Sequence, residues 1–220
     1  MNQSEIEQAR FNMIEQQIRP WDVLDQRVLD VMNSVPRELF VPQDCRSLAF
    51  ADTNIPLGHE QVMMAPKLEG RLLQTLAISP DDSILEIGTG SGYLTACLGK
   101  LGKHVTSIDI YSDFTTAAAA KLEVQGISNV TLETADAAEG IDSDTRYDVI
   151  AVTGSLPLLQ QQFRKNLAVG GRLFIITGAL PIMEARLITR VDENNWSSEC
   201  VLETCIPPLL HAARPQTFVF

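Results

Sequence analysis

The clearest candidate for chemistry is the stretch at residues 82–93, which reads DSILEIGTGSGY. A buried-strand pattern at 83–87 carries one acidic residue, Glu86, and is followed by a glycine-rich turn and a helical run. A strand that turns sharply into a helix leaves free backbone N–H groups at the start of that helix. Glycines let a ligand approach the backbone closely because they have no Cβ. The stretch therefore predicts a pocket for a small molecule.

The spacing of the glycines indicates which ligand class this is. Gly88, Gly90 and Gly92 follow Gly-x-Gly-x-Gly, whereas dinucleotide binders use Gly-x-Gly-x-x-Gly to hold a pyrophosphate. A carboxylate at Glu86 suits a cationic ligand and would repel a pyrophosphate. S-adenosylmethionine has an ammonium group and a sulfonium and no phosphate. We therefore expect Glu86 and the turn, including Thr89, to bind S-adenosylmethionine at its methionine end.

Two further acids lie where the nucleoside part of such a ligand is expected. Asp109 ends the next predicted strand, about twenty residues after the glycine turn, where an acid in a doubly wound sheet binds the ribose hydroxyls. The alternative for Asp109 is a solvated carboxylate without a ligand. Its separation from the glycine turn along the chain favours the ribose-binding role. Asp136 follows the third predicted strand and is expected to contact the adenine amino group, with a simple loop carboxylate as the alternative. Ile110 and Ala137, which follow these acids, complete the predicted cofactor site.

Alternating strand and helix patterns must position these residues. The expected strands are 83–87, 104–108, 130–133, 147–152 and 172–176, with helices near 93–101, 113–125 and 157–166. Such alternation predicts an α/β fold with a parallel, Rossmann-like sheet and helices on both faces. This is the fold of class I methyltransferases that use S-adenosylmethionine.

The segments on either side of this core differ from it. We expect one domain over 1–220, with an N-terminal helical cap and acceptor loop at 1–66, a cofactor-binding core at 67–180 and antiparallel C-terminal strands at 181–220. The cap contains a helix at 4–19 and a second helix capped by Asp25, before a loop-rich stretch at 43–66 and a helix at 67–77. The C-terminal part contains a hairpin of 185–191 with 199–205 and an edge strand at 218–220.

Composition excludes several classes of protein. The 220 residues are 45% hydrophobic and 20% charged, which is typical of a soluble globular domain. The net charge of −11 argues against nucleic acid as a partner, because phosphates need a basic face. No apolar run reaches the ~20 residues that span a bilayer, and the first residues lack the features of a secretory signal, so we expect a cytoplasmic protein. The cysteines lack metal-binding spacing, and no metal is expected; they are Cys45, Cys97, Cys200 and Cys205.

Four segments resemble one family. They are EQQIRP at 15–20, VPRELFVP at 35–42, GHEQ at 58–61 and LEIGTGSGY at 85–93. Together they are similar to the protein-L-isoaspartate O-methyltransferases, over roughly residues 11–180. This family transfers a methyl group from S-adenosylmethionine to the free α-carboxylate of isoaspartyl residues in damaged proteins, and the ester then cyclises to a succinimide that reopens partly to aspartate. The resemblance implies a methyltransferase in protein repair, with an isoaspartyl protein or peptide as substrate.

The resemblance also implies which residues form the catalytic loop. Asp52 and His59, with Gly58 and Gln61, would face the substrate and the sulfonium. Because an acceptor carboxylate is ionised at neutral pH and needs no general base, we expect His59 to position or order the loop, with a structural histidine as the alternative. The family has a serine that touches the substrate carboxylate, and Met64 stands at that position here.

Methionine cannot donate the hydrogen bond of that serine, and the alternative role for Met64 is packing over the cofactor. A hydrogen bond to a charged group contributes about 1.5–3 kcal/mol, whereas the orientation of two reactants contributes about 7–11 kcal/mol. Loss of the serine is therefore not expected to abolish methyl transfer. It leaves two other functions open, a methyltransferase with a different acceptor and a non-catalytic S-adenosylmethionine-binding module.

Overall fold

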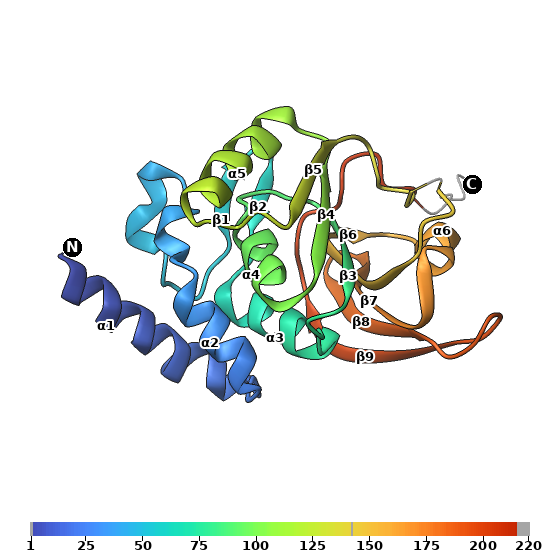
Figure 1. The fold of residues 1–220 in the computed structure, drawn as a ribbon, viewed down its shortest axis with the longest axis horizontal. Coiled ribbons are helices and arrows are strands. Elements are labelled where there is room, and N and C mark those ends of the chain that lie inside the picture. Colours follow the sequence, from blue (N-terminus) through green and yellow to red (C-terminus); the bar gives the residue numbers. More distant parts are fainter. Residues whose placement is uncertain (1, 142, 215–220) are drawn as a thin grey trace.

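A seven-stranded sheet forms the centre of the computed structural model, which describes residues 2–141 and 143–214 (Figure 1). Its strand order is β5-β4-β3-β6-β7-β8-β9. The strands are β3 (Ser83–Ile87), β4 (His104–Asp109), β5 (Val130–Thr134), β6 (Tyr147–Leu156), β7 (Leu167–Ala179), β8 (Ile182–Arg190) and β9 (Trp196–Thr204). Neighbours from β5 through to β7 are parallel, and β8 and β9 add antiparallel strands. The predicted α/β architecture is confirmed.

The chain reverses its direction across the sheet next to β3. From β3 it proceeds through β4 to β5 on one side, and it then returns to β6 and β7 on the other side of β3. Open α/β sheets bind ligands outside the carboxyl ends of the strands at such a switch point. The end of β3, where the glycine turn begins, is therefore at the position where a ligand is expected.

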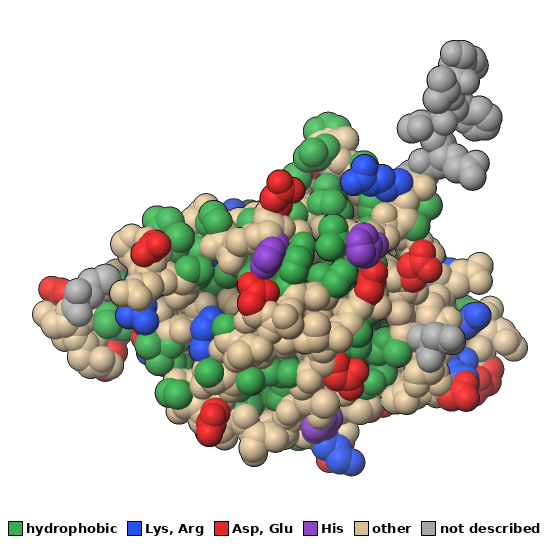
Figure 2. All heavy atoms as spheres, turned by 90° about the horizontal axis from the view of Figure 1, so that it is seen from above, with side chains coloured by type: hydrophobic (Ala, Val, Ile, Leu, Met, Phe, Trp, Pro, Cys, Tyr) green, Lys and Arg blue, Asp and Glu red, His purple; other side chains and the backbone are tan. Residues whose placement is uncertain are grey.

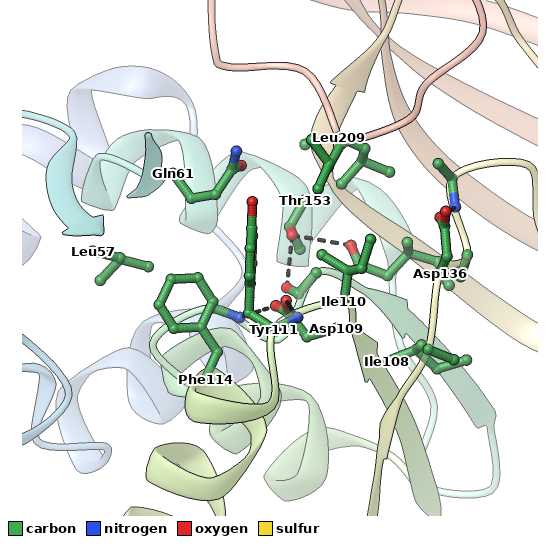
Figure 3. A pocket seen from close by; sticks show the side chains of 18 of the residues that line it. Leu57, Gln61, Ile108, Asp109, Ile110, Tyr111, Phe114, Asp136, Thr153 and Leu209 are labelled. Atoms are coloured by element: carbon green, nitrogen blue, oxygen red, sulfur yellow. Dashed lines mark hydrogen bonds between the residues drawn. The ribbon is translucent and has the colours of Figure 1, made fainter. Parts of the chain in front are cut away.

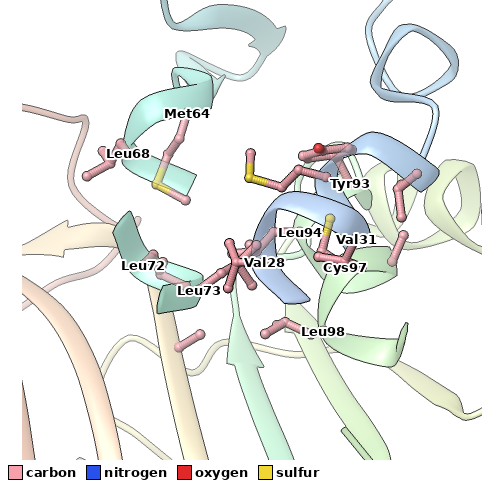
Figure 4. Close-up of a cluster of buried hydrophobic side chains, with 14 of the residues drawn as sticks. Val28, Val31, Met64, Leu68, Leu72, Leu73, Tyr93, Leu94, Cys97 and Leu98 are labelled. Atoms are coloured by element: carbon pink, nitrogen blue, oxygen red, sulfur yellow. The ribbon is translucent and has the colours of Figure 1, made fainter. Parts of the chain in front are cut away.

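Helices cover both faces of the sheet, but unequally. The α-helices are α1 (Gln3–Met13), α2 (Gln26–Ser34), α3 (Pro66–Leu76), α4 (Tyr93–Leu101), α5 (Ser112–Val124) and α6 (Gln161–Lys165). One buried cluster joins α2, α3 and α4 to one face of the sheet, for example Val28, Leu72 and Leu98 with Ile84 of β3 (Figure 4). The adjacent Leu85 belongs to a second cluster on the opposite face, where the short helix α6 packs. Successive residues of β3 thus serve two cores, as strand geometry requires.

The N-terminal cap is helical, as predicted, but its helix changes type. After α1 the chain forms a π-helical turn (Ile14–Ile18) and then a 3-10 turn (Arg19–Trp21), where Pro20 lacks the N–H that an α-helix needs. Asp25 caps α2, as expected, because its side chain accepts a hydrogen bond from the N–H of Arg27. Two further 3-10 turns follow α2, at Arg37–Leu39 and Gln43–Leu48.

Two predictions of secondary structure are wrong. The stretch at 43–66 contains a two-stranded sheet of β1 (Ile55–Gly58) and β2 (Gln61–Met63), although Pro56 and Gly58 read as loop signals. The helix expected at 157–166 is reduced to the five residues of α6, because residues 157–160 form a bend and irregular backbone and β7 begins at Leu167. The C-terminal hairpin is confirmed as β8 with β9, whereas the edge strand expected at 218–220 lies outside the described residues.

In the described part of the chain, none of the helices is both long enough and apolar enough to span a bilayer.

Candidate functional site

A pocket lies at the carboxyl ends of β3, β4 and β6, next to the switch point (Figure 3). Its apolar wall includes Leu57, Ile87, Ile108, Ile110, Tyr111, Phe114, Ala137 and Leu209, and its polar side chains are Gln61, Asp109, Asp136 and Thr153. Mostly apolar walls with a few polar groups are typical of sites for small organic ligands. The pocket is thus built from the segment that the sequence singled out, together with distant parts of the chain.

The glycine turn forms the floor of this pocket. Gly88 has a φ of +96°, and a Cβ built on it would lie 2.2 Å from Oγ1 of Thr153, whose hydroxyl donates a 2.7 Å hydrogen bond to the Gly88 carbonyl. Gly90 lines the pocket as well. Gly92 does not line it; a Cβ on Gly92 would lie 2.8 Å from Cβ of Ala118, so this glycine allows α4 and α5 to approach each other.

Asp109 lies on the pocket wall with its carboxylate fixed by the backbone. One oxygen accepts a hydrogen bond from the N–H of Gly90 at 2.9 Å, and the other accepts from the N–H of Tyr111 at 3.0 Å. Burial raises the pKa of this carboxyl, and these hydrogen bonds oppose the rise. Each oxygen retains a second lone pair, so the group can still accept hydrogen bonds from two ribose hydroxyls.

Beyond Asp109 the walls of the pocket are largely apolar. Ile110, Ala137 and Tyr111 lie on its walls, and Asp136 stands at the edge. One oxygen of Asp136 accepts from the N–H of Ala138 at 3.1 Å, and the other lies 2.7 Å from Nδ1 of His211. Asp136 therefore lines the pocket, and a histidine from the C-terminal segment contacts it.

The C-terminal segment at 206–210 closes one side of the pocket. The N–H of Ser155 donates to the carbonyl of Pro207 at 3.0 Å, and the N–H of Leu209 donates to the carbonyl of Ser155 at 2.9 Å. Leu209 is thereby held against the end of β6, and its side chain reaches the pocket opposite Leu57 and Gln61 of the β1–β2 hairpin (Figure 3).

Glu86 is not among the residues that line the pocket, and its direct contact with the cofactor stays a prediction. Its side chain is fully buried between β3, β4 and α4, where the hydroxyls of Thr95 and Ser107 each donate a 2.5 Å hydrogen bond to Oε2. Burial raises the pKa of Glu86 to about 8, although these hydrogen bonds lower it in part. At neutral pH the group is therefore largely a neutral carboxylic acid, and it supports the floor of the pocket from behind.

The buried acid predicts a pH-dependent stability. The folded protein keeps the Glu86 proton up to about pH 8, whereas the unfolded chain releases it near 4.5. Between these values the folded state binds more protons than the unfolded state, so the free energy of unfolding should fall as pH rises. One pKa unit corresponds to about 1.4 kcal/mol, so the total fall should be a few kcal/mol. Glu86→Gln, which is neutral at every pH, should flatten this fall. Urea unfolding of both proteins between pH 5 and 8.5 measures the difference, and parallel pH curves would contradict the prediction.

A smaller pocket adjoins the first at the glycine turn. The two pockets share Leu57, Val62, Gly88, Gly90 and Thr153. The smaller one is also lined by Met63, Met64, Glu69, Thr89, Ser91 and Leu94. Thr89, a predicted cofactor residue, is buried there, and its hydroxyl lies 2.6 Å from that of Ser107.

The three predicted catalytic residues are not gathered at one point. Met64 lines the small pocket and packs against the buried cluster of α2, α3 and α4 (Figure 4). His59 stacks on Tyr111, with ring centroids 3.9 Å apart, and its Nε2 lies 3.0 Å from a carboxylate oxygen of Asp113. Asp52 pairs with an ammonium group at 2.8 Å, that of Lys67. Neither His59 nor Asp52 lines either pocket.

On the face of the molecule in Figure 2, hydrophobic side chains lie between two histidines, and each histidine has an acidic side chain beside it. The described residues contain two histidine–aspartate pairs, His59 with Asp113 and His211 with Asp136. Asp136 lines the larger pocket, while His59 contacts that pocket through Tyr111. The two pairs link the β1–β2 turn and the C-terminal segment to residues at or beside the pocket.

Sequence reasoning missed several residues of the site. Tyr111 and Phe114 follow Asp109 closely, and their aromatic character next to a predicted ribose-binding acid was an available signal. Thr153 follows directly on a predicted strand, at the edge where ligands bind. Glu69 and Leu209 had no local signal, because only the tertiary fold brings them to the pockets.

Comparison with known sequences identifies the family. The sequence profile of the family described as protein-L-isoaspartate(D-aspartate) O-methyltransferase (PCMT) matches residues 8–207. A protein-L-isoaspartate O-methyltransferase of Rhodopseudomonas palustris is 36% identical over 201 residues, which are 91% of this chain and 92% of the relative. Another, from Protochlamydia amoebophila, is 37% identical and covers 81% of this chain and 84% of the relative.

Solved structures agree at the level of the fold. A protein-L-isoaspartate O-methyltransferase from Plasmodium falciparum, crystallised with S-adenosyl-L-homocysteine, superimposes with a TM-score of 0.76 at 19% identity, covering 93% of this chain and 97% of that one. A second protein-L-isoaspartate O-methyltransferase has a TM-score of 0.77 at 22% identity, covering 92% of this chain and 65% of that one. With the sequence matches over most of the length, these findings show that the chain belongs to the protein-L-isoaspartate(D-aspartate) O-methyltransferase family.

Proposed function

We propose that this protein transfers a methyl group from S-adenosylmethionine to the free α-carboxylate of isoaspartyl residues in damaged proteins, as a step of protein repair. The observation that carries the proposal is the family match over residues 8–207, which includes the loop and all residues that line the pocket except Leu209 and Leu210. The same match favours this function over a different acceptor and over a non-catalytic binding module. The net charge of −11 supports a protein rather than a nucleic acid as the substrate.

The pocket has the chemistry to hold this cofactor. Asp109 can accept hydrogen bonds from the ribose, and Gly88 and Gly90 let the ligand approach the backbone. Ile110 and Tyr111 offer an apolar surface to the adenine, with Asp136 at its edge. When bound, S-adenosylmethionine supplies a methyl group activated by its sulfonium.

The task left to the chain is alignment rather than acid–base chemistry. A carboxylate acceptor with an ordinary pKa of ~3.3–3.9 is already ionised at neutral pH, so it needs no general base to attack a methyl group. Val62, Met63 and Met64 form an apolar wall beside the glycine turn. Such a wall excludes water and leaves the acceptor carboxylate less hydrated, and a less hydrated carboxylate is a stronger nucleophile.

We also propose that the protein acts in the cytoplasm. Its four cysteines, Cys45, Cys97, Cys200 and Cys205, are all free thiols in the structure, which agrees with a reducing compartment.

A peptide pair tests the proposed activity. Methyl-ester formation should be detected on an isoaspartyl peptide and not on the same peptide with normal aspartate. Equal, background-level signals from both peptides would exclude the repair function. Calorimetric titration with S-adenosylmethionine on the same preparation then distinguishes the remaining possibilities, since a binding module takes up the ligand without transferring its methyl group.

The position of Met64 gives a mutational prediction. Met64→Ser restores a hydroxyl that can donate to the acceptor carboxylate, and we expect isoaspartyl methylation to rise about 10- to 100-fold, the value of a hydrogen bond to a charged group. Met63→Ser is the matched control, because Met63 is equally buried and lines the same pocket but is not at the serine position. Circular dichroism and cofactor titration verify that both variants fold. No gain for Met64→Ser, with cofactor affinity unchanged, would show that this wall does not meet the acceptor.

A further inference from the structure

A buried carboxyl group that the mechanism above does not use lies beside the glycine turn. Glu69, in the first turn of α3, is 2% exposed and is paired with Nη1 of Arg37. Arg37 is itself fully buried, and it also donates hydrogen bonds to the carbonyls of Ala49 at 2.9 Å and Met64 at 2.7 Å. The guanidinium therefore has three fixed partners, and it holds the Glu69 carboxyl in one place next to the acceptor loop.

Glu69 lines the small pocket, as do Gly88 and Gly90 of the glycine turn. Among the described residues that line the two adjoining pockets, the other carboxyl groups are those of Asp109 and Asp136, and both belong to the larger pocket. Asp109 is bound by the N–H groups of Gly90 and Tyr111, and Asp136 is paired with a histidine. Glu69 is thus the carboxyl that lines the small pocket and not the pocket expected to hold the nucleoside.

S-adenosylmethionine has a cationic ammonium group that would lie in the small pocket. Its ribose is joined through sulfur to an amino acid, so when the nucleoside lies against Asp109 and Tyr111, the ammonium group extends past the glycine turn. A buried ammonium needs an anionic or strong acceptor partner, because an unpaired buried charge is costly. Glu86, the acid that sequence spacing suggested for this role, is buried behind the pocket floor and lines neither pocket.

We propose that Glu69 is the residue that binds the ammonium group of S-adenosylmethionine. The inference rests on the proposed function, since it takes S-adenosylmethionine as the ligand. Arg37 is then a positioning residue, which aims the Glu69 carboxyl at the ligand.

A purely structural role for Glu69, as the counter-ion of Arg37, predicts no dependence on the ligand's amino group. The two roles are therefore separated by a pair of ligands, S-adenosylhomocysteine and its deaminated analogue, in which hydrogen replaces the ammonium group. Both are thioethers, so the sulfonium does not enter the comparison. Glu69→Gln keeps the shape and an acceptor for Arg37 but removes the charge, and Glu69→Asp keeps the charge on a shorter side chain.

Calorimetric titration of wild-type protein and both variants gives the test. Glu69→Gln should lower the affinity for S-adenosylhomocysteine about 10- to 100-fold and leave the affinity for the deaminated analogue within about 2-fold. Glu69→Asp should fall between wild type and Glu69→Gln for S-adenosylhomocysteine, and it serves as the test if the Gln variant does not fold. Glu86→Gln is the control, and it should weaken both ligands equally or not at all.

Equal losses of both ligands in the Glu69 variants, or no loss of either, would overturn the assignment. A loss confined to S-adenosylmethionine, with S-adenosylhomocysteine unaffected, would place the carboxyl at the sulfonium and would also overturn it. These outcomes are independent of the peptide assay: wild-type protein that methylates the isoaspartyl peptide keeps its proposed function even if Glu69 proves structural. Wild-type protein that binds neither ligand would refute both proposals.

Discussion

Gly88→Ala should reduce the affinity for S-adenosylmethionine at least about 100-fold, or about 2.7 kcal/mol. The alanine would have to adopt a φ of +96°, and its Cβ would lie 2.2 Å from Oγ1 of Thr153. Thr153 cannot easily move, because its hydroxyl donates to the carbonyls of Ile87 and Gly88. The turn would therefore have to shift, and with it the backbone that forms the pocket floor. Calorimetric titration measures the affinity, and circular dichroism confirms the fold.

Gly170→Ala is the control for backbone strain alone. Gly170 has a φ of +81°, close to that of Gly88, but a Cβ on it would have no atom within 4 Å. This variant should lose some stability and bind the cofactor as tightly as wild type. If both variants lost affinity to the same degree, the effect would be general strain, and the pocket floor would not depend on Gly88.

Arg37→Ala should destabilise the protein by about 3–5 kcal/mol, the cost of leaving a buried ionic partner alone. Arg37 and Glu69 are both buried, and the same change removes the hydrogen bonds to the carbonyls of Ala49 and Met64. Urea unfolding measures the loss. A second variant, Arg37→Met with Glu69→Met, should recover part of it, because an apolar pair leaves no buried charge.

An exposed ion pair provides the comparison for that experiment. Arg19 and Glu15 are paired at 2.8 Å, but the side chains are 36% and 37% exposed. Arg19→Ala should therefore cost no more than about 1 kcal/mol. Similar losses for Arg37→Ala and Arg19→Ala would mean that the Arg37 pair is not a buried ion pair in solution.

The sequence was most informative where the relevant signals are local. The bounds of β3 and α4 agree with the prediction, because an apolar strand, a glycine turn and a helical run follow one another there without a break. The β1–β2 hairpin was missed because Pro56 and Gly58 carry turn signals even within a short strand. Tertiary pairing overrode those signals, as it often does for short strands.

The assignment of Glu86 shows a different limit. Spacing in a motif places a residue near the end of a strand. It does not predict on which face of the sheet the side chain lies or which groups surround it there. Here the hydroxyls of Thr95 and Ser107 enclose the carboxyl behind the pocket floor. Glu69 is the opposite case. No pattern in the neighbouring sequence indicates that it is a site residue, and only the packing of α3 brings it to the small pocket.

The segment at 206–210 has a consequence for how the protein is made. Synthesis proceeds from the N-terminus, and the hairpin with Leu57 and Gln61 leaves the ribosome long before Leu209, which stands opposite on the same pocket. A growing or interrupted polypeptide that ends before Pro207 lacks both this wall and its pairing with Ser155. The pocket is therefore complete only after the chain has been made past Leu209 and this segment has paired with Ser155.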